Sequence, residues 1–212
     1  MEGPDLLDDV SAAGAEVVDV FALEQPAHRE AIIVDRRALA RLAGTKSPRG
    51  PVAVVRIPAE RVESGRNLLV SVGVSDPGNV GTMIRTAASF GWGYAYMEGS
   101  ADPWAPKTIR SGAGGQFQTP VSVLDSLDEL ADWVVVASVL GEGDPPEAVT
   151  ERPVALLMGE EAHGLPQSIV EAASYRMTIP TPGPTESLNV AVAAGIAIYL
   201  LSKPAGEDGG GV

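Results

Sequence analysis

Three segments in the last two-thirds of the chain combine residues that could bind a ligand or assist a reaction. They span residues 76–91, 157–165 and 179–194, and each places Gly, Asn, Ser or a carboxylate at the edge of an apolar stretch. Each segment starts where a predicted strand ends, and in an open α/β sheet ligands bind just beyond the carboxyl ends of the strands. We therefore expect the three segments to build one shared site.

The first segment contains an amide and a guanidinium that could act on a substrate. Asn79 follows a tight turn that starts at Asp76, and it precedes an apolar helical pattern, so it could also be the helix N-cap. Arg85 lies inside this helix, flanked by Ile84 and Ala87, where a charge is costly unless it is paired. Two interpretations of Arg85 stay open, a surface ion pair and a group that binds an anion or a substrate.

The second segment ends an apolar strand in glycines and carboxylates. Gly159, Glu160 and Glu161 come first, and His163 and Gly164 follow. Glycine lets a backbone approach a ligand closely. The segment lacks the Lys-Ser/Thr of a phosphate loop. The adjacent acids disfavour an anionic ligand and suit a cationic or hydroxyl-bearing one, although a turn with two solvated carboxylates has the same pattern.

The third segment is a proline-rich loop (residues 180–184) followed by an apolar helix that Ser187 and Asn189 open. We expect Ser187 to be the N-cap of this helix. No serine has a Gly-x-Ser-x-Gly setting, which disfavours a hydrolase triad. A Gly-x-Gly-x-x-Gly pattern after a first strand is also absent, which disfavours a dinucleotide-dependent oxidoreductase.

Composition excludes several other classes of protein. The 212 residues include no cysteine and two histidines, so neither a disulfide framework nor a thiolate or histidine metal site is expected. The longest apolar stretch, residues 190–201, is well short of the ~20 residues that a membrane span needs. No signal-peptide pattern begins the chain. We expect a soluble, cytoplasmic protein without a metal.

Charge is distributed unevenly along the chain. The net charge of −13 argues against a nucleic-acid partner, but residues 28–66 have a balance of +5 and residues 67–212 a balance of −11. Such asymmetry indicates a nucleic-acid-binding module, and a solvated charged face on a small domain is the alternative.

Apolar periodicity predicts alternating strands and helices, and therefore an α/β fold with a mainly parallel sheet. We expect a small α/β domain over residues 1–58, a linker over 59–66, a second domain over 67–203 and a disordered tail over 204–212. The last helix is apolar all round, so it should be buried in the core or in a dimer interface. Helices are predicted over 5–13, 36–42, 80–90, 106–111, 126–131, 166–173 and 188–201, and strands over 17–22, 31–34, 52–57, 68–74, 94–97, 133–139, 154–158 and 176–179.

Taken together and in this order, the three segments resemble the signature motifs of the SpoU/TrmH RNA ribose methyltransferases of the SPOUT superfamily. The likeness covers residues 67–201 and includes the intervening stretches 100–107 and 110–117. Residues 1–58 more weakly resemble the small ribosomal-protein-like substrate-binding domain of many relatives. The chain starts later than those relatives, which would leave this domain without its first strand or arm.

The resemblance implies a C-terminal deep trefoil knot, S-adenosylmethionine as methyl donor, and a homodimer whose sites are built from both chains. The implied knot loops are residues 157–165 and 179–190, and relatives bind the donor largely through the backbone of such loops. The residues expected to bind the cofactor are Leu157, Met158, Gly159, Gly164, Ile179, Pro180, Ser187, Leu188 and Asn189.

The implied catalytic residues are Arg85, Asn79, Glu161, Ser187 and Asn189. A guanidinium gives up its proton only with difficulty and is a poor base, so we expect Arg85 to bind RNA phosphate, orient the ribose 2′-hydroxyl and stabilise negative charge. Asn79 is expected to orient Arg85 or the ribose, and Glu161 to contact Arg85 or the substrate. Ser187 and Asn189 would shape the loop and meet the hydroxyl.

The second motif departs from the family at one position. The family usually has a small residue where this chain has Glu160, so two acids are adjacent; the spacing from Gly159 and Gly164 assigns the site to Glu161.

The substrate-binding domain and its basic cluster favour ribosomal RNA, most directly 23S rRNA, over tRNA. Relatives specific for tRNA tend to carry helical extensions at their termini, and no such extension is expected in this sequence. The alternatives are a tRNA 2′-O-methyltransferase and a non-catalytic RNA-binding or ribosome-assembly protein that kept the knot; the retained polar residues argue against the second. The residues expected to contact RNA are Arg29, Arg36, Arg37, Arg41, Lys46, Arg49 and Arg110.

Overall fold

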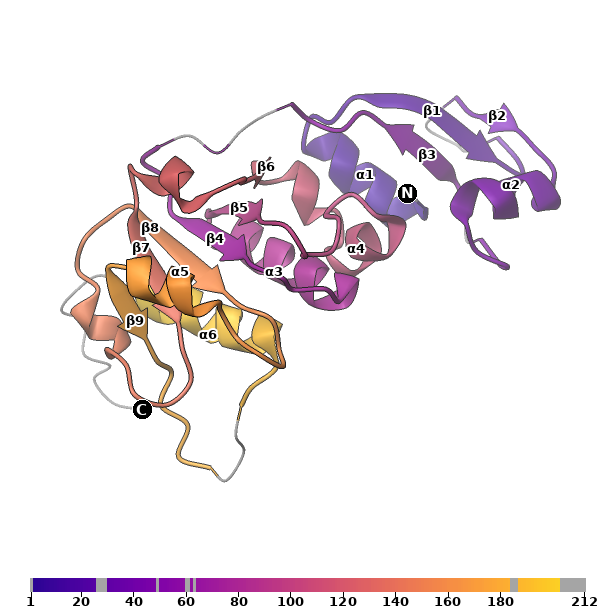
Figure 1. Ribbon diagram of the computed structural model, residues 1–212. Helices are drawn as coiled ribbons and strands as arrows, with labels where there is room; N and C mark the ends of the chain where they lie inside the picture. Colours follow the sequence, from indigo (N-terminus) through magenta and orange to yellow (C-terminus); the bar gives the residue numbers. More distant parts are fainter. Residues whose placement is uncertain are drawn as a thin grey trace, which may run out of the picture.

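The computed structural model describes residues 2–25, 30–48, 50–59, 62, 64–183 and 187–202, and arranges them around two sheets (Figure 1). Helices and 3-10 turns are α1 (Pro4–Ala12), α2 (Arg36–Ala43), α3 (Pro77–Ser89), α4 (Pro106–Ser111), α5 (Gln167–Ala172), α6 (Val190–Ser202), η1 (Gly115–Phe117), η2 (Leu127–Leu130) and η3 (Pro146–Ala148). Strands are β1 (Val17–Ala22), β2 (Ile32–Ile33), β3 (Val52–Val55), β4 (Leu68–Ser71), β5 (Gly93–Tyr96), β6 (Val121–Val123), β7 (Val134–Ser138), β8 (Val154–Met158) and β9 (Tyr175–Met177).

The larger sheet has the strand order β6–β5–β4–β8–β7–β9, and all of these neighbours are parallel. β4 and β8 are buried along their whole length, as expected for central strands of a sheet that is covered on both faces. The mainly parallel α/β sheet predicted from the sequence is therefore confirmed. β8 lies between β4 and β7, which puts the ends of β4 and β8 side by side.

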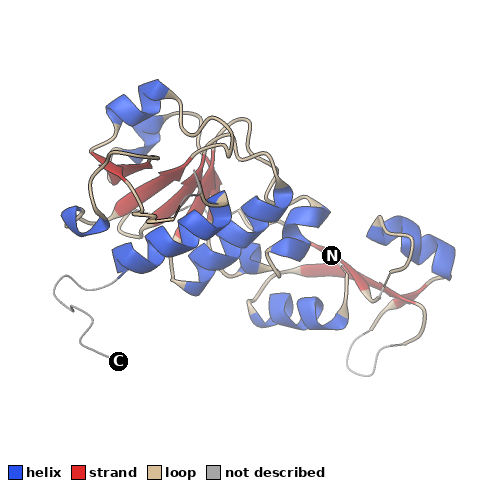
Figure 2. Ribbon diagram, turned by 90° about the horizontal axis from the view of Figure 1, so that it is seen from below, coloured by secondary structure: helices blue, strands red, loops and turns tan. Residues whose placement is uncertain are grey.

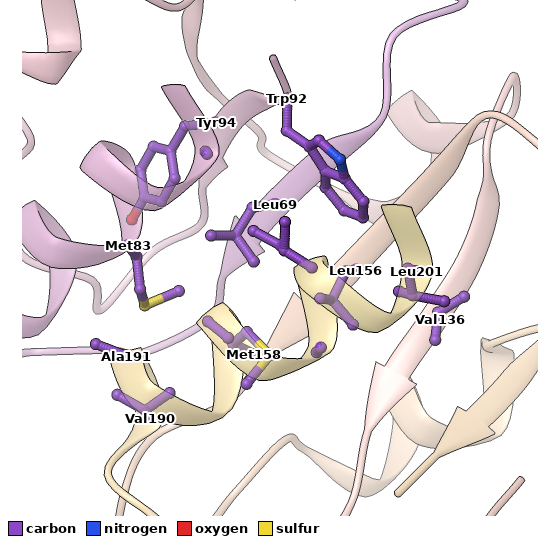
Figure 3. Close-up of a cluster of buried hydrophobic side chains, with 14 of the residues drawn as sticks. Leu69, Met83, Trp92, Tyr94, Val136, Leu156, Met158, Val190, Ala191 and Leu201 are labelled. Carbon is purple, nitrogen blue, oxygen red and sulfur yellow. The ribbon is translucent and has the colours of Figure 1, made fainter. Parts of the chain in front are cut away.

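Helices cover both faces of the large sheet (Figure 2). On one face α3 and α6 pack against strand residues such as Leu69 and Leu156, with Met83 and Ala191 contributed by the helices (Figure 3). On the other face a second cluster joins Leu157 and its strand neighbours to side chains of α5 and η2. Both clusters remove apolar surface from water, which is the main favourable term in folding.

α6 is less buried than its composition suggests. Its buried side chains include Val190, Ala194 and Ile198, whereas Val192 and Tyr199 remain about half exposed. The helix therefore packs one side on the core and presents an apolar side outward.

The N-terminal sheet is small and has the order β2–β1–β3, with β1 parallel to β2 and antiparallel to β3. Leu7 of α1 packs on this sheet against Val20 and Ala53. On the other side of α1, Leu6 and Val10 approach Gly114 so closely that a Cβ at Gly114 would lie 2.8 Å from Leu6 Cδ1. α1 therefore connects the small sheet to the turn that precedes η1.

Local sequence signals explain most element ends. Asp35 caps α2 by accepting from the Ala38 amide (2.7 Å), and Gly44 follows the helix in a left-handed conformation. α3 begins at Pro77 rather than at residue 80, because proline is well tolerated in the first helical turn. Asp76 is its N-cap, so the interpretation of Asn79 as the cap is wrong.

Two short elements differ from the predictions. The helix predicted over residues 126–131 is the 3-10 helix η2, with a capping box between Ser126 and Glu129. β6 was not predicted, because three residues are too few to establish an alternating pattern. The predicted disordered tail lies outside the described residues.

Candidate active site at the carboxyl edge of the large sheet

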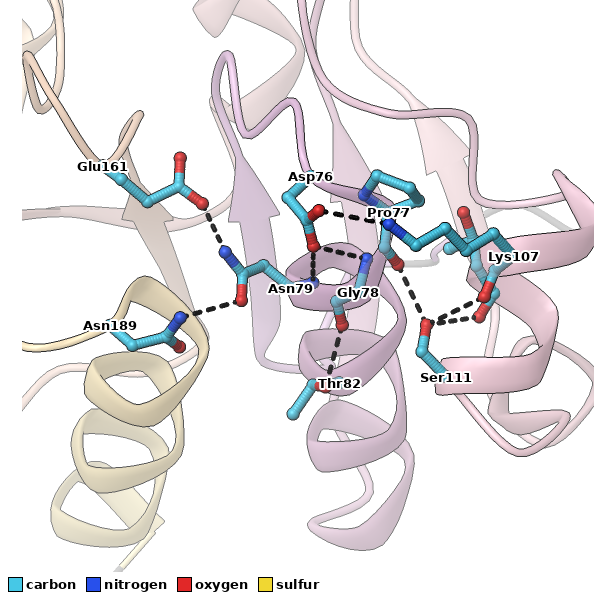
Figure 4. A network of polar contacts seen from close by, with 10 residues as sticks. Asp76, Pro77, Gly78, Asn79, Thr82, Lys107, Ser111, Glu161 and Asn189 are labelled. Carbon is cyan, nitrogen blue, oxygen red and sulfur yellow. Dashed lines mark hydrogen bonds and ion pairs between the residues drawn. The ribbon is translucent and has the colours of Figure 1, made fainter.

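Three polar side chains from distant parts of the sequence meet at the carboxyl edge of β4 and β8 (Figure 4). Asn79, at the start of α3, donates from Nδ2 to Glu161 Oε1 in the loop after β8. Asn189, at the start of α6, donates from Nδ2 to Asn79 Oδ1 (2.9 Å). One residue from each of the three sequence segments thus contributes to a single hydrogen-bonded network, as predicted.

The two ends of this network fix the orientation of both amides. Glu161, when ionised, can only accept, so Asn79 must turn its Nδ2 toward it and its Oδ1 toward Asn189. Asn189 then donates to Asn79 and keeps its own Oδ1 for the backbone amides of Ala191 (3.0 Å) and Val192 (3.2 Å). Asn189 is therefore the N-cap of α6, and the expectation that Ser187 caps this helix is wrong.

The loop after β8 is a tight turn that only glycine permits at its start. A Cβ at Gly159 would lie 2.2 Å from the carbonyl carbon of Gly164 and 2.4 Å from the Leu165 nitrogen, and these backbone atoms cannot move aside as a flexible side chain could. The Gly164 amide donates to the Glu160 carbonyl (2.8 Å), and Glu160 also contacts His163 (Oε2 to Nδ1, 3.1 Å). Glu160 therefore faces His163, while its neighbour Glu161 faces Asn79, the arrangement that the spacing indicated.

The start of α3 is held from the side by α4. Lys107 forms an ion pair with Asp76 (3.4 Å), and Ser111 Oγ donates to the Pro77 carbonyl (2.9 Å). The hydrogen bond from the Asn79 amide, followed by that from Gly78 and the Lys107 contact, lowers the pKa of Asp76 below its ordinary value. A negative N-cap is favourable at the positive end of a helix.

A glycine that the sequence analysis did not single out allows this contact between the helices. A Cβ at Gly81 would lie 1.9 Å from Ser111 Oγ and 2.5 Å from the Thr108 carbonyl oxygen, so α3 and α4 pack with no space between them. Gly81 lies inside a helical apolar pattern, where glycine is unfavourable. Its presence there was the one feature of the sequence that could have indicated a close helix contact.

Arg85 does not join the network in this chain. Its side chain is exposed, and it lies six residues, about 9 Å, beyond Asn79 along α3. Glu161 contacts Asn79 instead, so a contact between Glu161 and Arg85 within one chain, one of the two roles considered for this carboxylate, is not present. Ser187 is exposed beside residues that are not described, and it has no described contact with the network.

The residues predicted to bind the cofactor differ in how far their side chains are buried. The side chains of Leu157 and Met158 are buried in the two apolar clusters, so only their backbone could reach a ligand. Ile179 and Leu188 are half-buried, and Pro180 is exposed. In the described part of the chain, no residue accepts a hydrogen bond from the Ile179 or Leu188 amide.

The basic residues predicted to contact RNA fall into two places. Arg36, Arg37 and Arg41 are exposed on α2 with Lys46 just beyond it, at one end of the molecule, while Arg110 is exposed on α4 (Figure 1). Arg29 and Arg49 lie outside the described residues. The structure therefore does not bring Arg110 together with the α2 cluster.

No described helix is both long and apolar enough to cross a bilayer. Nor does any group of three or more His, Cys, Asp or Glu side chains in the described ranges have an arrangement that could hold a metal ion.

Comparison with known proteins gives one consistent family. The sequence profile of the SpoU rRNA Methylase family matches residues 66–199. The chain is 36% identical over 171 residues to the 23S rRNA (guanosine(2553)-2′-O)-methyltransferase RlmP of Bacillus subtilis, a match that covers 77% of this chain and 69% of that protein.

Solved structures agree with the sequence match. The S-adenosylmethionine-bound rRNA methyltransferase of Sinorhizobium meliloti superposes with a TM-score of 0.80 at 26% identity, covering 95% of this chain and 85% of the other. The SpoU methyltransferase AviRb of Streptomyces viridochromogenes, in complex with the same cofactor, also gives a TM-score of 0.80 at 26% identity, covering 95% and 88%. The matched region contains the whole Asn79–Glu161–Asn189 network, and the chain belongs to the SpoU rRNA methylase family.

Proposed function

We propose that this protein is an S-adenosylmethionine-dependent methyltransferase that methylates a ribose 2′-hydroxyl of ribosomal RNA, most directly 23S rRNA. The observation that carries the proposal is the network of Asn79, Glu161 and Asn189 at the carboxyl edge of the parallel sheet. Within the network Asn79 uses one amide hydrogen and one lone pair of oxygen. It keeps one hydrogen and one lone pair, which suits a group that both donates and accepts, such as a ribose hydroxyl.

The loops at this edge fit the cofactor. The amides of Ile179 and Leu188 have no acceptor among the described residues, and Gly159 at the end of β8 is only half-buried. The carboxylates of Glu160 and Glu161 at the same edge suit a cationic ligand better than an anionic one. We assign cofactor binding to the backbone of Gly159, Ile179 and Leu188, and S-adenosylmethionine, when bound, supplies a methyl group activated by a sulfonium.

Arg85 acts on the RNA in this proposal. Its guanidinium binds a backbone phosphate next to the target ribose and stabilises negative charge that develops on the 2′-oxygen. Asn79 positions the hydroxyl, and Glu161 and Asn189 hold Asn79 in the one orientation that leaves its free hydrogen and lone pair in place. Holding both reactants in register can supply a large part of the rate enhancement.

We further propose that Arg85 reaches the site from a second copy of the chain. Within one chain it lies about 9 Å along α3 from Asn79, outside the network. α6 presents Val192, Ile196 and Tyr199 outward at 52%, 36% and 53% exposure, and a Cβ at Gly195 on the same side would lie 3.9 Å from Thr86 of α3. This outward apolar side of α6, next to the helix that carries Arg85, is the surface we assign to the homodimer.

The C-terminal trefoil knot and the domain limits also belong to the proposal. α6 packs on η3, and the Arg152 guanidinium in the β7–β8 connection donates to the Leu201 carbonyl (2.6 Å). A C-terminal segment that passes through the β7–β8 connection accounts for both contacts. We assign residues 1–58 to RNA binding, 59–66 to the linker and 67–203 to catalysis.

Ribosomal RNA is preferred over tRNA because the likeness to structures of rRNA methyltransferases includes the N-terminal sheet. Those structures cover 95% of this chain, well beyond the residues 66–199 of the family profile. The exposed arginines of α2 lie in this additional part and are available for phosphate contacts.

Transfer of labelled methyl from S-adenosylmethionine to undermodified rRNA and tRNA, followed by nucleoside analysis, tests the reaction and the substrate together. We expect a 2′-O-methylated nucleoside from 23S rRNA, and loss of transfer in Arg85→Ala with cofactor binding intact. Cofactor binding without transfer to rRNA or tRNA contradicts the proposed substrate. A wild type that binds no cofactor supports the non-catalytic alternative.

Heterodimers test where Arg85 acts. A dimer of one Arg85→Ala chain and one Asn79→Ala chain, purified with two tags, contains one intact site if Arg85 works across the interface and none if it works within its own chain. We expect the heterodimer to recover up to half of the wild-type rate while each mutant homodimer stays inactive. An inactive heterodimer contradicts the shared site.

A further inference from the structure

A cleft of about 650 Å³ separates the N-terminal sheet from the large sheet. Its N-terminal wall is formed by the α1–β1 turn (residues 13–16) and by the stretch after β3 (residues 56–59). Its other wall is formed by Arg66, Trp104 and residues 116–121, which include the end of η1 and the start of β6. Cavities of about 300–1,000 Å³ are the size that holds ligands in proteins.

Two aromatic rings are held in place on the second wall. Trp104 and Phe117 contact each other edge to face, with ring centroids 5.5 Å apart and an interplanar angle of 67°. The Trp104 amide donates to Asp102 Oδ1 (2.8 Å), and Gln116 Nε2 donates to the Pro103 carbonyl (2.9 Å). Both rings are only half-buried, so the pair is a fixed and accessible stacking surface.

Two guanidinium groups also border the cleft, in a chain whose net charge is −13. Arg56 pairs with Glu16 (2.7 Å), but both side chains are more than 60% exposed, so the pair can exchange partners at little cost. Arg66 has one described side-chain hydrogen bond, a long one to the Gly91 carbonyl (3.5 Å), which leaves most of its donors available. Guanidinium donors in this setting select a phosphate.

We infer that this cleft binds an unpaired nucleotide of the RNA substrate, with its base on the Trp104–Phe117 pair and its phosphate at Arg66 and Arg56. Sequence-specific recognition of RNA mostly uses unstacked bases placed on aromatic side chains and arginine. The inference rests on the proposed function and deepens it. It assigns RNA contacts to the cleft in addition to the basic residues of α2, which are not among those that line it.

The cleft is structurally connected to the catalytic helix. A Cβ at Gly115, in the same 3-10 turn as Phe117, would lie 3.2 Å from the Cα of Arg85. The turn that carries Phe117 therefore packs directly on the backbone of α3. Through this contact, a nucleotide bound in the cleft would have a fixed position relative to the backbone of Arg85.

Binding of a short single-stranded oligoadenylate and of undermodified 23S rRNA, measured by fluorescence anisotropy on the full-length protein, tests the inference. Stacking of one base contributes about 1–3 kcal/mol, so we expect Trp104→Ala to weaken binding about 5- to 140-fold. Trp104→Phe keeps a ring and should weaken it less. Arg66→Ala should reduce the slope of log affinity for RNA against log salt concentration by about 1, the value for one lost phosphate contact. The matched control Arg176→Ala, outside the cleft, should leave both the affinity and this slope unchanged.

The outcomes separate the inference from the proposed function. A wild type that methylates and binds RNA while Arg66→Ala, Trp104→Phe and a folded Trp104→Ala bind as tightly as it does overturns the cleft assignment alone. A wild type that neither binds nor methylates RNA overturns both. A third outcome is that the cleft binds free adenosine monophosphate but no oligonucleotide, and that Trp104→Ala abolishes this binding. The ligand of the cleft would then be a mononucleotide rather than RNA, which also overturns the inference.

Discussion

Asn189 performs two functions that a pair of substitutions can separate. Its Oδ1 caps α6 through the amides of Ala191 and Val192, and its Nδ2 donates to Asn79. Asn189→Ala removes both. Asn189→Asp keeps an oxygen for the cap but replaces the donor with a second acceptor that faces the Asn79 carbonyl oxygen.

The expected stability changes follow from these contacts. Loss of an N-cap costs about 0.5–2 kcal/mol, and loss of the hydrogen bond to Asn79 about 0.5–1.5 kcal/mol. Asn189→Ala should therefore lose roughly 1–3 kcal/mol of unfolding free energy. For a chain of this length that is a decrease in Tm of about 2–12 °C. Asn189→Asp should lose less, because Asp caps as well as Asn and its charge is favourable at a helix N-terminus.

The expected activities differ from the expected stabilities. In Asn189→Asp the carboxylates of Glu161 and residue 189 both face Asn79. The Asn79 amide can donate to both only if its oxygen turns away from its present position, which changes the group that it offers to the substrate. We expect Asn189→Asp and Asn189→Ala to lose methyl transfer about tenfold or more, the equivalent of one hydrogen bond of ~1.4 kcal/mol. Calorimetry for Tm and labelled methyl transfer measure both quantities. An Asn189→Asp enzyme that transfers methyl at the wild-type rate, or an Asn189→Ala protein as stable as Asn189→Asp, refutes the reasoning.

Three further substitutions address the surroundings of the site. Gly159→Ala places a Cβ 2.2 Å from the Gly164 carbonyl carbon, so the turn must open, and isothermal titration should detect weakened cofactor binding while circular dichroism detects a folded protein; unchanged binding contradicts this. Arg152→Ala removes hydrogen bonds to three backbone carbonyls and should lower Tm by several degrees, for a loss of about 1–3 kcal/mol, with Arg152→Lys in between. Asp76 has a lowered pKa, mainly through the Asn79 amide, so it stabilises the fold above its unfolded pKa. The stability advantage of the wild type over Asp76→Asn should therefore be complete near neutral pH and disappear as pH falls below about 4. An advantage that persists in acid would contradict this assignment.

Local patterns predicted the elements but not the contacts between them. α3 was readable from its apolar period and β8 from its continuous apolar run, since both signals lie within a dozen residues. The Asn79–Glu161 hydrogen bond joins residues 82 positions apart, so only the strand order brings them together. The choice between Ser187 and Asn189 as the α6 cap failed for a different reason, because both residue types cap well and helix ends vary by one or two residues.

The approximate locations of the network residues Asn79, Glu161 and Asn189 were therefore predictable, whereas their hydrogen-bond partners were not. The spacing from Gly159 and Gly164 assigned the site to Glu161, and in the structure Glu161 contacts Asn79 whereas Glu160 contacts His163. The six-residue spacing of Asn79 and Arg85 corresponds to about 9 Å along a helix, so their separation on α3 was predictable from the sequence. The contacts that Asn79 makes with Glu161 and Asn189 were not predictable, because these residues lie far away along the chain.

The central position of β8 has a consequence for synthesis on the ribosome. β4, β5 and β6 can pair in chain order, but the other edge of β4 stays open until β8 has been made, because β7 pairs with β8 and β9 and not with β4. Between Ser71 and Val154 the ribosome adds about 80 residues, which takes roughly 4–16 s at 5–20 residues per second. During this interval the nascent chain carries an apolar strand edge in the middle of its future core. An unpaired edge of this kind is a template for association with other chains, so this half of the sheet is the part of the protein most dependent on protection while it is being translated.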